Sequence, residues 1–308
     1  MEGTVKAVDG VDLKLGKEET LGIAGESGCG KSTLALSTVR LIPHPGRIVE
    51  GEIVFNGEDL LKKDDEQMRE IRGGKIAMIF QNPLSALNPV FTIEYQVGEA
   101  FKIHQKIRKD EVDEKVADML DKVGIPDSSR RMKDYPHQFS GGMRQRTVIA
   151  MAISCNPSLL LADEPTTSLD VTIQAQILEL MKELKKRMRS SIILITHDLG
   201  LIAELCERVA IMYAGKIVEY SDVRTLFREP KHPYVLALLG SVPGLEKELE
   251  RFTVIRGSVP SLINPPTGCR FWPRCDFATQ ICRETEPQPI EVKKGHISHC
   301  HHVDKLNY

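Results

Sequence analysis

The chain has 308 residues, of which 41% are hydrophobic and 27% are charged, a composition typical of a globular protein with a large buried core. Its formal net charge of −2 gives no excess of positive charge to attract nucleic acid, which argues against a protein that binds DNA or RNA. No apolar run reaches the roughly 18 residues of a membrane-spanning helix and no signal peptide opens the chain, so we expect a cytoplasmic protein. The chain length predicts roughly two domains.

A glycine-rich turn stands between the first predicted strand, residues 20–24, and the first predicted helix, residues 33–37. The turn holds the full G-x-x-x-x-G-K-S pattern from Gly25 to Ser32, called the phosphate loop below. A chance match would be an ordinary glycine turn, but a strand, turn and helix in this order point N–H groups and a helix N-terminus at one place. We expect Lys31 to reach the terminal phosphates of a nucleotide and Ser32 to ligate magnesium. The N–H groups expected to bind phosphate are those of Ser27, Gly28, Cys29, Gly30, Lys31, Ser32 and Thr33.

A mostly helical region is predicted from residue 82 to residue 155, after a strand at residues 75–80 that is followed by Gln81. The helical spacing of apolar residues is clearest at Val112, Val116, Met119, Leu120 and Val123. We expect this apolar stripe to pack in a core rather than to bind a ligand.

Ser140, Gly141 and Gly142 stand at the expected start of a helix whose apolar part covers residues 147–153. A hydroxyl, unhindered N–H groups and the positive end of a helix dipole would then face one point. Such an arrangement is an anion-binding nest.

A short apolar run, residues 159–162, leads into Asp163 and Glu164 and predicts a buried parallel strand with two carboxylates at its C-terminal end. Open α/β sheets place ligands at that edge. Two acids after a strand more often form a helix cap or a solvated turn. Because the same chain also has the phosphate loop, we favour a functional role for them. We expect Asp163 to hold magnesium, directly or through water, and Glu164 to polarise the attacking water as a general base. Together the two motifs indicate a nucleotide hydrolase.

The motifs, in this order, resemble those of the ATP-binding subunits of ABC transporters over about residues 4 to 230. The stretch from Phe139 to Arg146 looks like the signature motif of that family. The resemblance implies that Ser140, Gly141 and Gly142 act in trans, closing over ATP that is held by a second ATPase subunit.

Three further positions resemble landmarks of the same family. Gln81 looks like the Q-loop glutamine, which implies that it senses magnesium and the attacking water. Asp170, at the end of Ser168-Leu169-Asp170, resembles the D-loop aspartate that contacts the partner's site. His197 follows the predicted strand 191–196 and resembles the switch histidine that contacts the γ-phosphate. A lone histidine after a strand is more often structural, but in an otherwise complete set of motifs we expect a functional one.

The resemblance implies an α/β P-loop NTPase fold, of the kind found in ABC nucleotide-binding domains. Residues 1–81 and 156–230 would form the RecA-like and β core, and residues 82–155 the helical subdomain with the signature motif. Residues 231–308 would form a small cysteine-rich C-terminal extension.

Four sequence segments resemble, more specifically, the ATPases of dipeptide and oligopeptide importers. They are residues 135–146, 88–93, 232–234 and 238–243. The resemblance then implies a peripheral protein at the cytoplasmic face of the cell membrane, which powers peptide import with ATP. Its expected partners are a second ATPase subunit in a homo- or heterodimer, two transmembrane permeases and, indirectly, a substrate-binding protein. The segment just after Gln81 would dock the coupling helices of the permeases.

Three other functions stay open. Nickel importers share much of this tail, so an importer of nickel or another small solute is one alternative. A soluble ABC ATPase of DNA repair or translation is a second, although it would need a long coiled-coil insertion or two cassettes in one chain, and neither is visible. A pure iron-sulfur or regulatory binding protein is a third, but it would not need both Glu164 and His197.

The tail becomes rich in proline and cysteine after Arg256, and its prolines rule out long regular elements. Four of the seven cysteines lie there, at Cys269, Cys275, Cys282 and Cys300. A loop-rich segment this small needs a cross-link, and a reducing cytoplasm disfavours disulfides, which leaves a metal. Zinc sites usually have C-x2-C pairs, whereas four thiolates without such pairs suit a 4Fe-4S cluster, as the resemblance to peptide importers also implies. Zinc and free or disulfide-bonded cysteines stay open as alternatives. A mixed zinc site could also draw on His296, His299, His301 and His302.

The family's adenine-stacking residue is missing. ABC ATPases stack adenine on an aromatic side chain upstream of the phosphate loop, yet residues 1–24 contain no Phe, Tyr, Trp or His. The usual first strand is also absent before Gly3. Either the chain is trimmed or begins late relative to its relatives, which we expect, or adenine binds with little stacking. The source of base selectivity stays unassigned.

Overall fold

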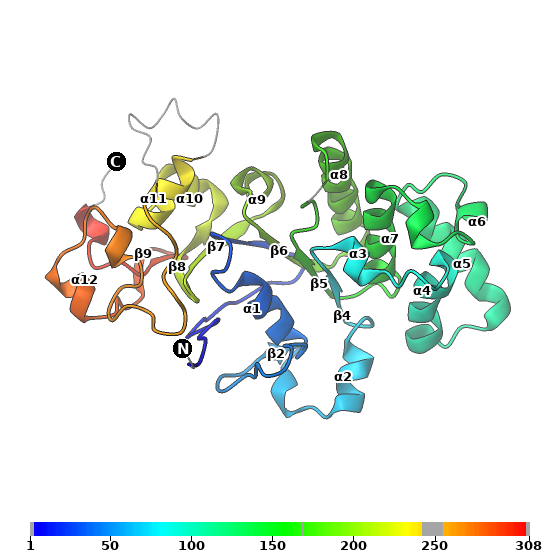
Figure 1. The fold of residues 1–308 in the computed structure, drawn as a ribbon, viewed down its shortest axis with the longest axis horizontal. Helices are drawn as coiled ribbons and strands as arrows, with labels where there is room; N and C mark the ends of the chain where they lie inside the picture. The colour runs from blue at the N-terminus through cyan, green and yellow to red at the C-terminus, as the bar shows by residue number, and fades with distance from the viewer. Residues whose placement is uncertain (1–2, 168, 242–254, 306–308) are drawn as a thin grey trace. The chain divides into compact units, whose positions relative to one another are not determined.

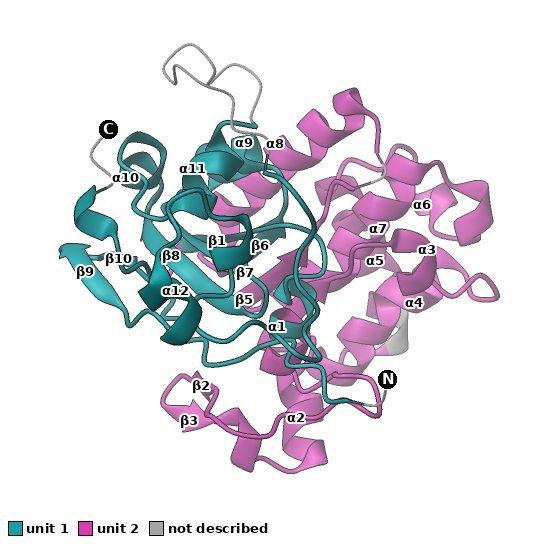
Figure 2. Cartoon of the chain, turned by 60° about the vertical axis from the view of Figure 1, so that its left-hand side comes forward, with its two compact units in different colours: residues 1–15, 20–34, 194–308 teal, residues 16–19, 35–193 magenta. Residues whose placement is uncertain are grey.

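The structure is a computed structural model that describes residues 3–167, 169–241 and 255–305 (Figure 1). Ser168 of the predicted D-loop and the end of the 238–243 phrase lie outside these residues. The chain forms two compact units, coloured separately in Figure 2, and each is described by itself. Unit 1 comprises residues 1–15, 20–34 and 194–308, and unit 2 comprises residues 16–19 and 35–193. Within the described ranges, no helix has both the length and the apolar character needed to cross a membrane.

Unit 1 is built on strands that run β1, β7, β8, β10 and β9 across a sheet. Strand β1 (Thr20–Ala24) pairs in parallel with β7 (Arg208–Tyr213), with Leu21 opposite Arg208. Strand β7 returns through a tight turn into the antiparallel β8 (Lys216–Asp222). All five residues of β1 are buried, as expected of an apolar strand in the interior of a sheet.

The C-terminal extension adds two strands to this same sheet. Strand β10 (His296–Ser298) pairs antiparallel with β8, and β9 (Ile290–Lys293) pairs antiparallel with β10. Short helices complete unit 1: α9 (Leu199–Leu205), α10 (Val223–Arg228), α11 (Pro233–Leu239), α12 (Gln280–Glu284) and the 3-10 turn η4 (Trp272–Arg274). No described element after Arg256 exceeds five residues, as the prolines there predict.

Unit 2 contains the parallel pair β4 (Ile76–Ile79) and β5 (Leu159–Asp163), and the small hairpin β2 (Val54–Phe55) and β3 (Glu58–Asp59). Its helices are α2 (Asp65–Ile71), α3 (Pro83–Ala86), α4 (Ile93–Ala100), α5 (Lys109–Lys122), α6 (Ser128–Arg131), α7 (Gly141–Ile153) and α8 (Val171–Met188). Helices α3 to α7 pack on one another, in the cyan-to-green part of Figure 1. The apolar stripe of α5 is buried, so its predicted role in core packing is confirmed.

Two elements contain a boundary between the units. Helix α1 (Lys31–Thr38) begins in unit 1, and β6 (Ser191–Thr196) ends there. The strands predicted at residues 20–24, 159–163 and 191–196 are confirmed, as is the helix after the phosphate loop. The three-part division of the chain stays a prediction. Within the structure, the extension belongs to the same compact unit as the phosphate loop.

Candidate nucleotide-binding site

The phosphate loop connects β1 to α1 in unit 1. Gly25, Gly28 and Gly30 have φ of 152°, 79° and 108°, values that favour glycine. A Cβ at Gly30 would lie 2.0 Å from the carbonyl oxygen of Ala7, so only glycine lets the loop pass there. The buried ammonium of Lys31 donates to the carbonyl oxygens of Gly25 at 2.7 Å and Glu26 at 3.0 Å.

The other predicted phosphate contacts lie in the same turn. Ser32 and Thr33 are in the first turn of α1, and Cys29 is fully buried. Burial raises the pKa of the Cys29 thiol, so this residue contributes through its backbone rather than as a thiolate. The loop leads directly into the first turn of α1, which is the context that phosphate binding requires, and the individual contacts stay a prediction.

The predicted acids of unit 2 lie at the end of β5. Asp163 is buried as the last residue of the strand, and Glu164 follows with φ of 46°. One carboxylate oxygen of Glu164 accepts hydrogen bonds from Gln81 Nε2 and Thr167 Oγ1, both at 2.8 Å. Strands β4 and β5 are parallel neighbours, with Ile79 opposite Ala162, so the residues after them meet at one edge. The structure thus brings together Gln81 and Glu164, which lie 83 positions apart.

The signature residues begin α7. Ser140 is the N-cap, and its exposed hydroxyl accepts a hydrogen bond from the N–H of Met143 at 3.3 Å. A Cβ at Gly142 would lie 2.9 Å from the side chain of Ile173. Asp170 caps α8 by accepting from the N–H of Ile173 at 2.9 Å. The predicted signature motif and D-loop therefore start two helices of unit 2 that touch at their N-terminal turns.

His197 follows β6 in unit 1 and is exposed. The next residue, Asp198, caps α9 by accepting from the N–H groups of Gly200 and Leu201. The cap holds the backbone just after His197 in a defined conformation, while the imidazole stays accessible to a ligand.

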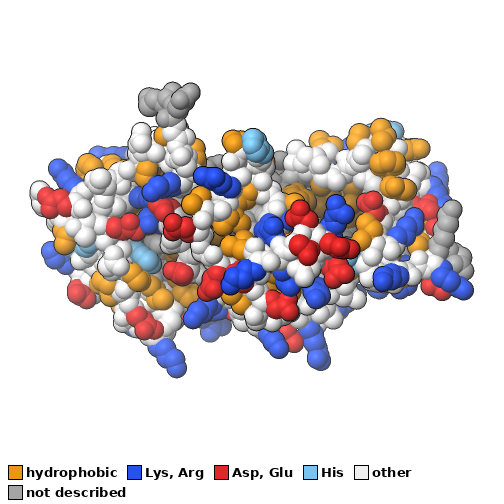
Figure 3. Space-filling model, turned by 90° about the horizontal axis from the view of Figure 1, so that it is seen from below, with side chains coloured by type: hydrophobic (Ala, Val, Ile, Leu, Met, Phe, Trp, Pro, Cys, Tyr) orange, Lys and Arg blue, Asp and Glu red, His pale blue; other side chains and the backbone are white. Residues whose placement is uncertain are grey.

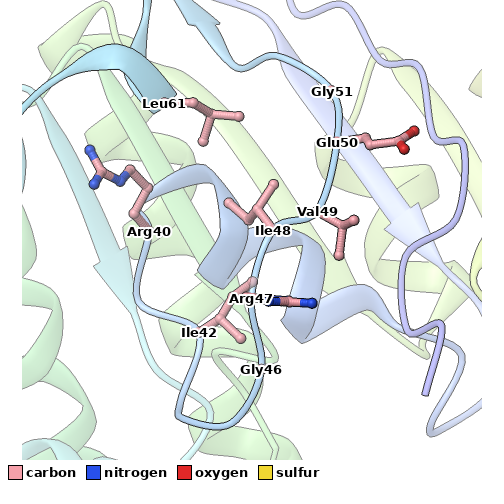
Figure 4. A pocket seen from close by; sticks show the side chains of 9 residues that line it. All are labelled: Arg40, Ile42, Gly46, Arg47, Ile48, Val49, Glu50, Gly51 and Leu61. Atoms are coloured by element: carbon pink, nitrogen blue, oxygen red, sulfur yellow. The ribbon is translucent and has the colours of Figure 1, made fainter. Parts of the chain in front are cut away.

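A pocket in unit 2 is lined by residues outside these motifs (Figure 4). It is lined by Arg40, Ile42, Gly46, Arg47, Ile48, Val49, Glu50, Gly51 and Leu61. None of these is a predicted site residue, and Arg40 already donates to the carbonyl oxygens of Leu60 and Lys63. We therefore assign it no role.

Two residues that the motifs do not reveal contact the phosphate loop. The hydroxyl of Tyr234 accepts from the N–H of Glu26 at 2.9 Å, and the guanidinium of Arg274 forms an ion pair with the Glu26 carboxylate. Tyr234 belongs to a phrase noted above for its family resemblance alone. No spacing rule connects Arg274 to a loop 248 positions earlier.

The predicted metal centre of the tail is not supported. Among residues 3–167, 169–241 and 255–305, no three His, Cys, Asp or Glu side chains form a group that could hold a metal ion. Burial raises the pKa of Cys275 to about 12 and that of Cys300 to about 11. Cys269 and Cys275 pack against the apolar core of unit 1, and Cys282 Sγ lies 3.6 Å from His302 Nε2.

Two family models match the chain. The one described as ABC transporter matches residues 8–167, and the one described as oligopeptide/dipeptide transporter, C-terminal region, matches residues 218–282. The chain is 51% identical to a probable peptide ABC transporter ATP-binding protein of Sinorhizobium fredii, covering 97% of this chain and 90% of that protein. It is 46% identical to a dipeptide transport ATP-binding protein of Escherichia coli, covering 96% and 91%. Among solved structures, a dimeric post-hydrolysis state of the ATP-binding cassette MJ0796 with ADP and Pi matches with a TM-score of 0.62 at 28% identity, covering 71% of this chain and 91% of that one.

Proposed function

Because this chain belongs to the ATP-binding proteins of ABC transporters, we propose that it binds and hydrolyses ATP to power the import of dipeptides or oligopeptides. The observation that carries this function is similarity to peptide-transport ATP-binding proteins over nearly the whole chain, the C-terminal region included. The matches favour neither a nickel importer nor a soluble ATPase of DNA repair or translation. On the face shown in Figure 3, basic and acidic side chains are interspersed, and this face lacks the continuous basic patch that would attract nucleic acid.

In unit 1, the proposed role of the phosphate loop is to bind the ATP phosphates through its N–H groups. Lys31 would exchange its backbone carbonyl partners for the terminal phosphates, and Ser32 would ligate the magnesium ion that accompanies ATP. Magnesium, when bound, neutralises charge that develops on the phosphates. His197 would steady the γ-phosphate. Its exposure at the end of β6 supports this role.

In unit 2, Glu164 is the proposed general base for the attacking water. Its carboxylate is positioned by Gln81 and Thr167, which both donate to the same oxygen, and its proposed role is to accept the proton of that water. Asp163, buried at the end of β5, would position magnesium together with Gln81.

A second ATPase subunit is the proposed partner of the signature motif. Ser140, Gly141 and Gly142 would act on the nucleotide of that subunit, and Asp170 would contact its site. Exposure of Ser140, Gly141 and Asp170 supports this role, and MJ0796 has been solved as a dimer. The dimer is a homodimer or a heterodimer.

Two transmembrane permeases are the proposed membrane partners, and their dock is an apolar surface that follows Gln81. Leu84 and Val90 are 62% and 70% exposed, and the exposed rings of Phe91 and Tyr95 stack at 4.5 Å. Exposed apolar side chains grouped in this way mark interaction sites. This dock would hold the chain at the cytoplasmic face of the membrane, where the permeases connect it to a substrate-binding protein.

The 4Fe-4S cluster of the tail, with zinc as its alternative, is a separate proposal that rests on the family resemblance and on the choice of four cysteines. The mutual electrostatic effects of Cys269, Cys275, Cys282 and Cys300 are consistent with their lying in one neighbourhood. No step of ATP hydrolysis is assigned to this group, because the residues proposed for that chemistry lie in the phosphate loop and after β4, β5 and β6.

The test of the enzyme is Glu164→Gln, which keeps the side-chain shape and removes the base. Hydrolysis should fall by about 10²- to 10⁴-fold while ATP binding persists. Glu183→Gln, which removes an exposed carboxylate of α8, is the matched control and should hydrolyse ATP normally. Near-normal turnover by the Glu164 variant would show that another group is the base.

The test of import uses the whole transporter. The chain should co-purify with two permeases, and vesicles containing the complex should take up a labelled dipeptide only when Glu164 is intact. Uptake of nickel ions but not of peptide would overturn the substrate assignment.

A further inference from the structure

An arginine of the C-terminal extension clamps the phosphate loop. The guanidinium of Arg274 donates to both carboxylate oxygens of Glu26, from Nη1 at 2.6 Å and from Nη2 at 3.0 Å. The side chain of Arg274 is only 6% exposed, and that of Glu26 is 26% exposed. A two-bond contact between a guanidinium and a carboxylate fixes orientation as well as distance. The pair is therefore a defined connection rather than a fluctuating surface contact.

Glu26 is held at three points inside the phosphate loop. Its carboxylate binds Arg274, its N–H donates to the hydroxyl of Tyr234, and its carbonyl accepts from the ammonium of Lys31 at 3.0 Å. Two of these three partners come from the chain beyond residue 230. The conformation at the start of the loop, and the place of Lys31, thus depend on the C-terminal part of unit 1.

The segment that carries Arg274, residues 269–275, is itself anchored and is called the arginine segment. Its buried Phe271 packs edge-on against Tyr213, with ring centroids 5.2 Å apart, and lies 5.3 Å from Tyr234. Arg274 Nη1 also donates to the hydroxyl of Tyr213 at 3.3 Å. This aromatic packing holds the guanidinium in front of Glu26.

A second contact runs from the arginine segment to the far side of the loop. Arg270 donates to the carbonyl oxygen of Ala214 and forms an ion pair with Asp9. The next residue of the β7–β8 turn, Gly215, donates its N–H to the carbonyl of Cys29 at 2.8 Å. The arginine segment therefore reaches the phosphate loop at Glu26 directly and at Cys29 through the turn.

We propose that Arg274 is a positioning residue for ATP binding: it holds Glu26 in place and neutralises its carboxylate. A carboxylate inside a loop that binds polyphosphate repels the ligand unless a cation compensates it, and the repulsion is stronger where water is partly excluded. The arginine segment thereby makes the nucleotide affinity of the cassette depend on the C-terminal extension. This inference rests on the proposed ATP-binding function.

The test is calorimetric titration of ATP with magnesium into the full-length chain and its variants. Arg274→Ala should weaken ATP binding by about 10- to 100-fold, because the uncompensated Glu26 carboxylate then repels the phosphates. Adding Glu26→Gln to that variant should recover most of the lost affinity, because the uncompensated charge is then gone. Arg274→Lys keeps the charge without the fork and should fall between the wild type and Arg274→Ala.

Lys293→Ala is the matched control, since it removes an exposed ion pair with Glu229 from the same extension, and it should leave ATP affinity unchanged. A merely structural role for Arg274 predicts no recovery from Glu26→Gln, so an unrecovered double variant overturns the proposal. Folded Arg274→Ala protein that binds ATP like the wild type overturns it as well. If Arg274→Ala does not fold, the other two single variants decide. Wild-type ATP affinity in both Arg274→Lys and Glu26→Gln then overturns the proposal. A wild-type chain that binds no ATP would instead refute the proposed function.

Discussion

Acid should destabilise unit 1 through His232, the buried N-cap of α11. The ring is 1% exposed, and its Nδ1 accepts a hydrogen bond from the N–H of Tyr234 at 3.1 Å. Burial lowers the pKa of His232 from 6.5 to about 3, with a smaller effect from His299. Because the folded pKa is below the unfolded one, the stabilisation is complete above pH 6.5 and is lost as the pH falls toward 3.

The magnitude follows from the width of this window. At about pH 4.5, two units below the unfolded pKa, the unfolded chain gains about 3 kcal/mol relative to the folded one. The assay is urea unfolding at about pH 7.5 and about pH 4.5, followed by the fluorescence of Trp272, the chain's single tryptophan, which adjoins Phe271. His232→Asn is the reference variant, since asparagine can cap a helix but does not titrate.

Every other acid effect is shared by the two proteins and cancels in the comparison. The wild type should therefore lose about 3 kcal/mol more than His232→Asn between the two pH values. Equal losses would show that His232 is not held neutral by burial, and would refute the reasoning.

Two further predictions concern the partner subunit and the tail. Ser140→Arg should abolish ATP hydrolysis, because the arginine would block the partner's nucleotide. In a binding titration the variant chain should still bind ATP at its own phosphate loop. Loss of ATP binding by the isolated variant would show that the motif works in cis. If a 4Fe-4S cluster is present, anaerobically purified protein should be brown, absorb near about 400 nm and contain about four irons per chain, and Cys275→Ser should bleach it. Colourless protein with one zinc would support the zinc alternative, and metal-free protein with an ordered tail would exclude both metals.

The local parts of the fold were predictable because their signals are local. A run of apolar residues before a glycine-rich turn predicted β1, and the spacing of Val112, Val116 and Val123 predicted a helix with a buried face. Ser140 was placed correctly at a helix start, since a hydroxyl before two glycines satisfies the first free N–H groups. The order of these motifs also carried the family resemblance, which the comparisons confirm.

The tail shows where local reasoning ended. Its cysteines indicated a metal, yet among the described residues no three ligating side chains form a group that could hold one, and Cys275 and Cys300 pack in apolar clusters. The tail also joins the sheet of unit 1, where β10 adds to the edge of β8. Spacing along the chain does not report burial or edge pairing, which depend on what folds against a segment.

Local sequence is enough to predict the residues that bind phosphate. A glycine-rich turn with its lysine, and a strand that ends in two acids, depend mainly on residues next to them in the chain. Tertiary structure alone decided the pairings: Gln81 with Glu164 across adjacent parallel strands, and Arg274 with Glu26 across 248 positions. Such contacts depend on strand order and on the packing of distant aromatic rings. No local periodicity encodes either, so only the folded chain shows that its C-terminal extension contacts the predicted phosphate loop.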